Sequence, residues 1–219
     1  MKRKVKKVKE MFSLTKEQLS VLTNFEKERL SFRLVNTERN KSRLEKLVSR
    51  EFLDLSITYH YEIDKNAFVG VTEELLKGWN LSESELFQIA KENHQPFIQK
   101  MSDLLGELAT FPIEDVGIGM EVITNKSKWN GAISMIDNEV LSQVAEKLES
   151  DLFILPSSIH ECICVSADWN SIEVFKEMVK EVNVIEVAEH ERLSDNVYYY
   201  NRQLGVISIA DEEKTTKYA

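Results

Sequence analysis

The side chains best suited to catalysis lie in one short stretch, which contains Ser157, Ser158, His160, Glu161, Cys162 and Cys164. A serine or cysteine nucleophile beside a histidine base is common in hydrolases, so Ser158 with His160 is the pair to weigh. The strand expected over 159–167 would turn His160 and both cysteines to one face and Glu161 to the other, so Glu161 would not orient the base. The sequence contains no Gly-x-Ser-x-Gly elbow. We therefore expect no catalytic residue here, and a hydrolase centred on Ser158 and His160 is the alternative.

A metal site at His160, Cys162 and Cys164 fails on distance. Alternate residues of a strand lie roughly 6.5–7 Å apart, which separates the outer two by about 13 Å. Zinc ligands lie within about 2.3 Å of the metal. We expect instead two reduced cysteines that fill the core as small apolar side chains. The pair Gly117 and Gly119 lacks the third glycine of a dinucleotide-binding loop. The sequence thus predicts no metal and no cofactor.

Three arginines and three tyrosines are the candidates for contact with a partner: Arg33, Arg39, Arg43, Tyr198, Tyr199 and Tyr200. The arginines belong to a basic stretch over 29–50, where aromatic side chains that could stack on bases are sparse. A solvated face is the simpler interpretation of this stretch. The tyrosines could form a recognition patch on an edge strand, because tyrosine is favoured at interfaces. The alternative is a strand with one inward and two outward tyrosines.

Charge is distributed unevenly along the 219 residues. Residues 1–9 carry six basic and no acidic residues, so the remainder holds 28 − 6 = 22 basic against 37 acidic residues, a net of −15 within a total of −9. An acidic body repels nucleic acid and anionic membranes, although the basic arm could touch a polyanion weakly. No stretch approaches the roughly 18 apolar residues of a membrane span, and no apolar segment of a secretory signal follows the basic start. We expect a cytoplasmic protein without membrane contact that does not hold nucleic acid.

Apolar periodicity and turn residues predict helices mixed with adjacent strand pairs, with no regular βαβ alternation and no internal repeat. Capping-box patterns at Thr15–Gln18 and Ser82–Glu85 mark two helix starts. The expected strands are 30–35, 53–63, 67–72, 120–124, 132–136, 152–155, 159–167, 197–200 and 206–209. The other expected helices are 72–77 with a cap at Gly78, 97–108, 137–148 and 170–183.

These elements favour an α+β class, with a single domain built on a largely antiparallel mixed sheet flanked by amphipathic helices. We expect a basic N-terminal arm and helix over 1–28, the α+β domain over 29–210, and a disordered tail over 211–219. Few glycines and prolines interrupt the chain, seven and three respectively, so no flexible linker is expected inside it.

Several segments resemble one bacterial family, the domain of unknown function 5688, which is common in gut Firmicutes and their mobile elements. The segments are Asp151–Glu161, Val165–Asp168, Leu193–Tyr200, Phe52–Ile57, and Ile123–Asn125 with Gly131 and Ala132. The resemblance covers roughly residues 25–205. This part of the chain resembles the C-terminal half of the family. It implies a bacterial or phage-borne cytoplasmic protein of similar fold and implies no activity. Relatives carry a longer N-terminal half, so a partner or a homo-oligomer would supply what that half contributes to the sheet.

The leading hypothesis is a non-enzymatic binding or regulatory protein that acts through protein–protein contact. An acidic, compact chain without a workable active site motivates it. If mobile elements carry the protein, antagonism of a host factor would fit. The alternatives are the hydrolase at Ser158 and His160, and nucleic-acid contact through the basic N-terminal arm.

Overall fold

The computed structural model describes residues 14–65, 67–108, 119–156, 158–169 and 171–211. The predicted basic arm over 1–9 lies outside the described residues, as does the predicted tail beyond residue 211. The chain forms two compact units. The first unit is drawn from Met1–Arg33, Thr37–Glu51 and Ser56–His94, and the second from Leu34–Asn36, Phe52–Leu55 and Gln95–Ala219.

A four-stranded sheet organises the first unit, in the order β1-β3-β2, with β4 paired antiparallel to β3. The long strand β3 is buried on both faces. Tyr59 and Tyr61 fill one face, while Thr58 and His60 lie on the other, and none of the four is more than 9% exposed. The elements are α2 (Lys16–Thr23), η1 (Lys27–Arg29), β1 (Leu30–Asn36), η2 (Glu38–Asn40), α3 (Lys41–Leu44), β2 (Ser49–Phe52), β3 (Leu55–Asp64), β4 (Ala67–Gly70), α4 (Glu73–Trp79) and α5 (Glu83–Asn93).

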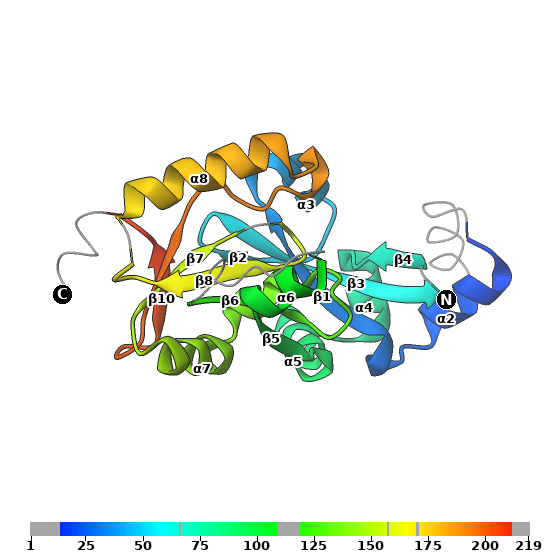
Figure 1. Ribbon diagram of the computed structural model, residues 1–219. Helices are drawn as coiled ribbons and strands as arrows, with labels where there is room; N and C mark the ends of the chain where they lie inside the picture. The colour runs from blue at the N-terminus through cyan, green and yellow to red at the C-terminus, as the bar shows by residue number, and fades with distance from the viewer. Residues whose placement is uncertain (1–13, 66, 109–118, 157, 170, 212–219) are drawn as a thin grey trace. The chain divides into compact units, whose positions relative to one another are not determined.

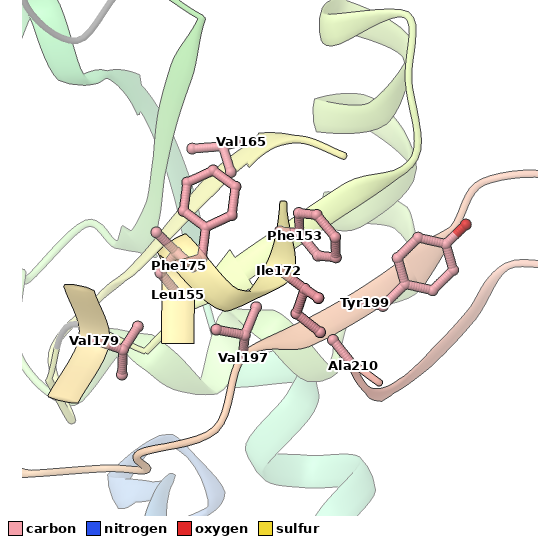
Figure 2. Packing of buried hydrophobic residues seen from close by; sticks show 9 residues of the cluster. All are labelled: Phe153, Leu155, Val165, Ile172, Phe175, Val179, Val197, Tyr199 and Ala210. Atoms are coloured by element: carbon pink, nitrogen blue, oxygen red, sulfur yellow. The ribbon is translucent and has the colours of Figure 1, made fainter. Parts of the chain in front are cut away.

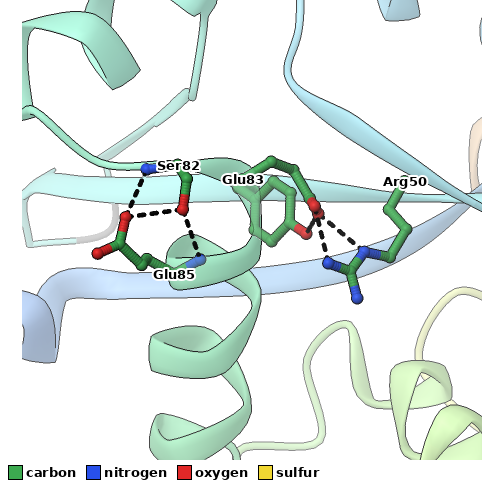
Figure 3. A network of polar contacts seen from close by, with 5 residues as sticks. Arg50, Ser82, Glu83 and Glu85 are labelled. Atoms are coloured by element: carbon green, nitrogen blue, oxygen red, sulfur yellow. Dashed lines mark hydrogen bonds and ion pairs between the residues drawn. The ribbon is translucent and has the colours of Figure 1, made fainter.

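The start of α5 ties the helix to this sheet. The predicted capping box is present, with the Ser82 hydroxyl accepting from the Glu85 backbone N–H and the Glu85 carboxylate accepting from the Ser82 backbone N–H. The adjacent Glu83 carboxylate accepts two hydrogen bonds from Arg50, at 2.9 and 2.7 Å, and one from the Tyr59 hydroxyl (Figure 3). Arg50 also lies over the Phe87 ring. This arginine of the basic stretch is therefore a packing residue.

The second unit is a layered structure around a six-stranded sheet in the order β10-β9-β7-β8-β6-β5, and neighbouring strands are antiparallel throughout. Helix α8 covers one face and α7 lies on the other (Figure 1). The elements are β5 (Pro96–Lys100), α6 (Met101–Leu108), β6 (Met120–Asn125), η3 (Gly131–Ile136), α7 (Asn138–Leu148), β7 (Leu152–Leu155), β8 (Cys162–Ser166), α8 (Ile172–Ile185), η4 (Glu189–Glu191), β9 (Tyr198–Asn201) and β10 (Val206–Ile209).

Strand alternation divides the apolar side chains between these two layers. Phe153 and Val165 are paired in register and turn toward α8, where they pack with Phe175 and Val179 (Figure 2). The intervening residues of β7 and β8 turn to the other face, and all four residues of β7 are buried. Burial on both faces explains why β7 reads in the sequence as an unbroken apolar run.

Two elements differ from the sequence predictions. The predicted helix over 97–108 is divided into strand β5 and helix α6, because Pro96–Lys100 pairs with β6 along its whole length. Pro96 is accommodated as the first residue of an edge strand, where its missing N–H costs no ladder bond. The predicted strand over 132–136 is instead the buried 3₁₀ turn η3, which Ser134 fastens by donating to the Thr124 carbonyl at 2.6 Å.

A third correction concerns Gly78, which lies inside α4, while Asn80 in the left-handed conformation ends that helix. The α+β class with largely antiparallel strands is confirmed, with the described strands distributed over two sheets. The hairpins expected from 53–72 and 197–209 are confirmed as β3–β4 and β9–β10.

Substitution Gly131→Ala tests the tight approach of η3 to β6. An added Cβ would lie 2.2 Å from Thr124 Oγ1, 2.5 Å from the Asn125 nitrogen and 2.6 Å from the His160 carbonyl oxygen. Because two of these atoms are backbone, we expect the free energy of unfolding to fall by about 2–3 kcal/mol. The control is Gly78→Ala, where nothing lies within 4 Å and helix propensity should add about 0.5–1 kcal/mol. Denaturant unfolding measures both, and an unaffected Gly131→Ala variant would contradict the packing.

Candidate functional site

His160 lies in the loop before β8, not in the strand itself, because β8 begins at Cys162. The turn after β6 packs against it. Asn125 holds this turn by bonding both the backbone N–H and the carbonyl of Trp129, and Trp129, which is 57% exposed, places its ring 4.7 Å from the imidazole. The predicted strand over 159–167 is thus too long at its N-terminal end.

Both imidazole nitrogens of His160 have partners. Nδ1 accepts a hydrogen bond from the Asn130 backbone N–H at 3.1 Å, which leaves Nε2 to carry the proton that faces Glu191 Oε1 at 3.4 Å. The side chain is 16% exposed. Glu191, and not Glu161, is the carboxylate that orients this histidine.

Ser158 is engaged elsewhere. Its hydroxyl donates to Glu161 Oε1 at 3.2 Å and accepts from the His160 backbone N–H at 3.0 Å. A Ser-His hydrolase needs the serine hydroxyl within hydrogen-bond reach of an imidazole nitrogen, and here Asn130 and Glu191 occupy both nitrogens. The geometry of the described residues therefore favours a structural loop over the hydrolase centred on Ser158 and His160.

The two cysteines are free thiols on the buried face of β8. Both are 0% exposed, and burial is the largest cause that raises the pKa of each thiol. Cys162 Sγ lies 3.7 Å from Met135 Sδ. Among the described residues no three histidine, cysteine or acidic side chains are arranged to hold a metal. These surroundings are those of packing residues.

The three predicted arginines differ in their environments. Arg39 and Arg43 are exposed, whereas Arg33 on β1 is half-buried and its Nε has no hydrogen-bond partner among the described residues. Desolvation, followed by the charge of Arg43, lowers the pKa of Arg33 to about 10. The structure therefore separates one half-buried arginine from the solvated face expected for the stretch.

The three tyrosines are buried, at 0%, 5% and 1% exposure for Tyr198, Tyr199 and Tyr200. Strand β9 lies between β10 and β7, so the expected edge-strand position is wrong, as is the alternative of two outward tyrosines. Each hydroxyl donates to a polar group of the same unit: Asp54, Asp151 and Asn138 respectively. Their role in partner contact stays a prediction that the burial does not favour.

The segment Leu193–Tyr198 is fastened by one carboxylate far away in the sequence. Asp54 Oδ2 accepts from Ser194 Oγ at 2.6 Å and from Asn196 Nδ2 at 3.0 Å, and Oδ1 accepts from the Tyr198 hydroxyl at 2.7 Å. Asn183 on α8 donates to the Ser194 carbonyl at 2.9 Å. The polar residues of this segment therefore serve to hold it in place through hydrogen bonds within the second unit.

The exposed face of α8 carries an apolar stripe that the sequence analysis missed. Val174, Met178, Val182 and Ile185 are 40%, 43%, 37% and 65% exposed. Their spacing of four, four and three residues places them on one side of the helix, beside the face that is buried on the sheet. The signal was present in the sequence, because apolar residues occupy more of this helix than one core-facing stripe requires.

Acidic side chains border this stripe. Glu177 and Glu181 are exposed and lie one turn from Val174 and Met178. Over residues 171–191 the sequence holds six glutamates against two lysines. We call the four apolar residues with these two glutamates the α8 surface.

Comparison with known proteins identifies the family. A match to the family of unknown function DUF5688 covers residues 1–202 of the chain. The chain belongs to this family. The DUF5688 match is wider than the expected bounds of 25–205 at its N-terminal side, and it gives no support to the expected restriction to the family's C-terminal half. No curated protein and no solved structure matches the chain significantly. Within the part of the chain that is described, no helix of this DUF5688 protein has the length and apolarity needed to cross a bilayer.

The thiols of Cys162 and Cys164 should react slowly with Ellman's reagent at neutral pH in the native protein. Burial and raised pKa values keep the thiolate fraction and its access to the reagent low. Both thiols should react fully once the protein is unfolded in denaturant. Rapid native labelling, or stoichiometric zinc in the purified protein, would contradict a structural role.

Because of His60, the first unit should lose stability as the pH falls below about 6.5. Burial, then the charges of Arg33 and Arg43, lowers its pKa to about 3 from 6.5. The unfolded chain thus binds more protons between these values, so stability is lost as the pH falls from about 6.5 toward 3, at up to roughly 1.4 kcal/mol per unit.

The measurement is denaturant unfolding at pH 7 and pH 4.5 for the wild type and for His60→Gln. We expect the stability lost between the two pH values to be about 2–3 kcal/mol smaller in the variant. Equal losses in the two proteins would mean that His60 is protonated without penalty.

Proposed function

We propose that this DUF5688 protein is a non-enzymatic binding protein that docks a basic amphipathic helix of a partner protein on the α8 surface. The observation that carries the proposal is the second apolar stripe of α8. The first stripe, with Phe175 and Val179, already packs on the sheet (Figure 2). A helix needs one such stripe to join a core, and contiguous exposed apolar patches commonly mark interaction sites.

The chemistry of the stripe fits a helix as the ligand. Anchors spaced three or four residues apart match the apolar face of an amphipathic helix, and Met178 supplies an adaptable side chain at their centre. Glu177 and Glu181 would lie beside the polar flank of a docked helix. Electrostatic complementarity therefore favours lysine and arginine on that flank.

Enzymatic alternatives have less support from the structure. Ser158 and His160 do not bond through the imidazole, and the cysteines are enclosed. A direct check is Ser158→Ala in any hydrolase assay that gives a signal, because loss of that signal would favour the enzyme.

The binding test uses a fluorescein-labelled, amidated peptide of leucine and lysine, patterned with the helical period. We expect saturable binding in fluorescence anisotropy. The double substitution Met178→Gln with Ile185→Gln should weaken it at least about tenfold, since losing one buried apolar contact already approaches 1.4 kcal/mol. Glutamine preserves helix propensity, and both sites are exposed, so folding should be unaffected.

The matched control is Val184→Gln, the same type of change at a residue that is 70% exposed but off the stripe. It should bind as the wild type does. Glu181→Gln should weaken binding and reduce its salt dependence, and a leucine–glutamate peptide should not bind. Absence of saturable binding, or equal loss in the Val184 control, would overturn the proposal.

A further inference from the structure

One face of strand β3 in the first unit is both buried and polar. Ser56, Thr58 and His60 point to this side and are at most 9% exposed. Thr37 Oγ1 lies 2.9 Å from Ser56 Oγ, and Thr58 Oγ1 lies 3.1 Å from His60 Nε2. A row of hydroxyls and an imidazole is an unusual covering for a sheet face, because burying polar groups is costly unless each is paired.

Arg33 reaches the same face from the neighbouring strand. Ser31 of β1 donates to the His60 carbonyl at 3.3 Å, so the two strands lie side by side at this point. Phe32 turns to the opposite face, where its ring meets Phe87 of α5. Alternation therefore places Arg33 on the side of Ser31, with the polar row of β3.

One donor of the half-buried Arg33 guanidinium has no partner within the described part of the chain. Its Nε is enclosed and makes no hydrogen bond among the described residues. Arg50, by comparison, donates two hydrogen bonds to the Glu83 carboxylate. Half-buried arginines are ordinarily paired with carboxylates, phosphates or other acceptors, so this enclosed Nε is a donor that the oxygen of a bound anion would satisfy.

The charges around Arg33 have one sign. Apart from desolvation, the influence on its pKa is Arg43, and the charges that act on His60 are Arg33 and Arg43. Among the described residues, no carboxylate contributes to the pKa shift of Arg33 or of His60. The two guanidinium charges of Arg33 and Arg43 thus lie close enough to act on each other and on the neutral imidazole of His60.

We propose that Arg33 and Arg43, together with the polar row of β3, form a binding site for a phosphate-type oxyanion. Planar guanidinium forks match the oxygens of phosphate, and charge-assisted hydrogen bonds of this kind are strong. Arg43 is exposed and gives access from solvent, while Arg33 supplies the donor farther inside. The bound group is either free phosphate or the phosphoryl group of a small metabolite. This site is independent of the α8 surface.

The experiment is a calorimetric titration of the full chain with inorganic phosphate, with ionic strength held constant by sodium chloride. We expect saturable binding, and a parallel titration should shift the imidazole resonances of His60, which are identified by their absence in His60→Gln. Arg43→Gln should raise the dissociation constant by about tenfold or more, the scale of one charge-assisted hydrogen bond. The control Lys46→Gln removes one exposed positive charge from the same stretch and should leave binding unchanged.

Arg33→Gln gives a signature that misfolding would not produce. Phosphate binding should be lost, while thermal unfolding without phosphate should occur at the wild-type temperature or above, because an unpaired, desolvated charge has been removed. Adenosine monophosphate provides the second arm: tighter binding than phosphate, with the same arginine dependence, would identify the phosphoryl group of a metabolite as the ligand. Absence of saturable phosphate binding at matched ionic strength, or unchanged binding in both arginine variants, would overturn the proposal.

Discussion

The carboxylate of Asp54 holds together parts of the second unit that no local sequence preference could join. It accepts hydrogen bonds from Ser194, Asn196 and Tyr198, which lie 140 to 144 residues farther along the chain. These donors precede and begin β9, and β9 in turn pairs with β7 at the centre of the sheet. Burial and the Asp54 charge both raise the pKa of Tyr198, so its hydroxyl remains a donor. One acidic side chain thus sets where β9 enters the sheet.

The position of β9 determines what α8 can do. Tyr199 and Val197 complete the apolar bed on which Phe175 packs, and Asn183 fastens the helix to the segment that Asp54 holds. A helix anchored along one side cannot rotate to bury a second stripe. The exposure of Val174 and Met178 therefore follows from the architecture and is not the result of loose packing, which is why the α8 surface is a persistent feature that a partner can use.

The sequence predicted the elements whose signals are local. Capping boxes located α2 and α5, strand alternation located β1, and the turn around Arg202–Gly205 located the β9–β10 hairpin. Two errors came from tertiary competition. The apolar spacing of Phe97, Met101 and Leu104 fits a helix. The first part of that segment instead forms a strand, because it pairs with β6. The buried residues of η3 read as a strand because burial, without alternation, does not distinguish the two.

The candidate site could be predicted in composition but not in pairing. The sequence contained His160, Ser158 and Glu161 within four residues, yet the orienting carboxylate is Glu191, thirty-one residues away. That partner depends on how the loop before β9 returns past β8, which no spacing rule encodes. The sequence likewise contained no sign of the two contacts that exclude a Ser-His pair, which His160 makes with Asn130 and Glu191.

Two arginines that look alike in the sequence differ in their partners. Arg33 and Arg50 lie in one basic stretch, and both are half-buried. Arg50 meets Glu83 because the N-terminus of α5 places an acidic residue in front of it, and that pairing offsets the cost of desolvation. Arg33 faces hydroxyls, an imidazole and another arginine, so nothing in the described unit offsets the same cost. Composition assigns both to a solvated face, whereas the position of one glutamate makes the first a packing residue and leaves the second available to an external anion.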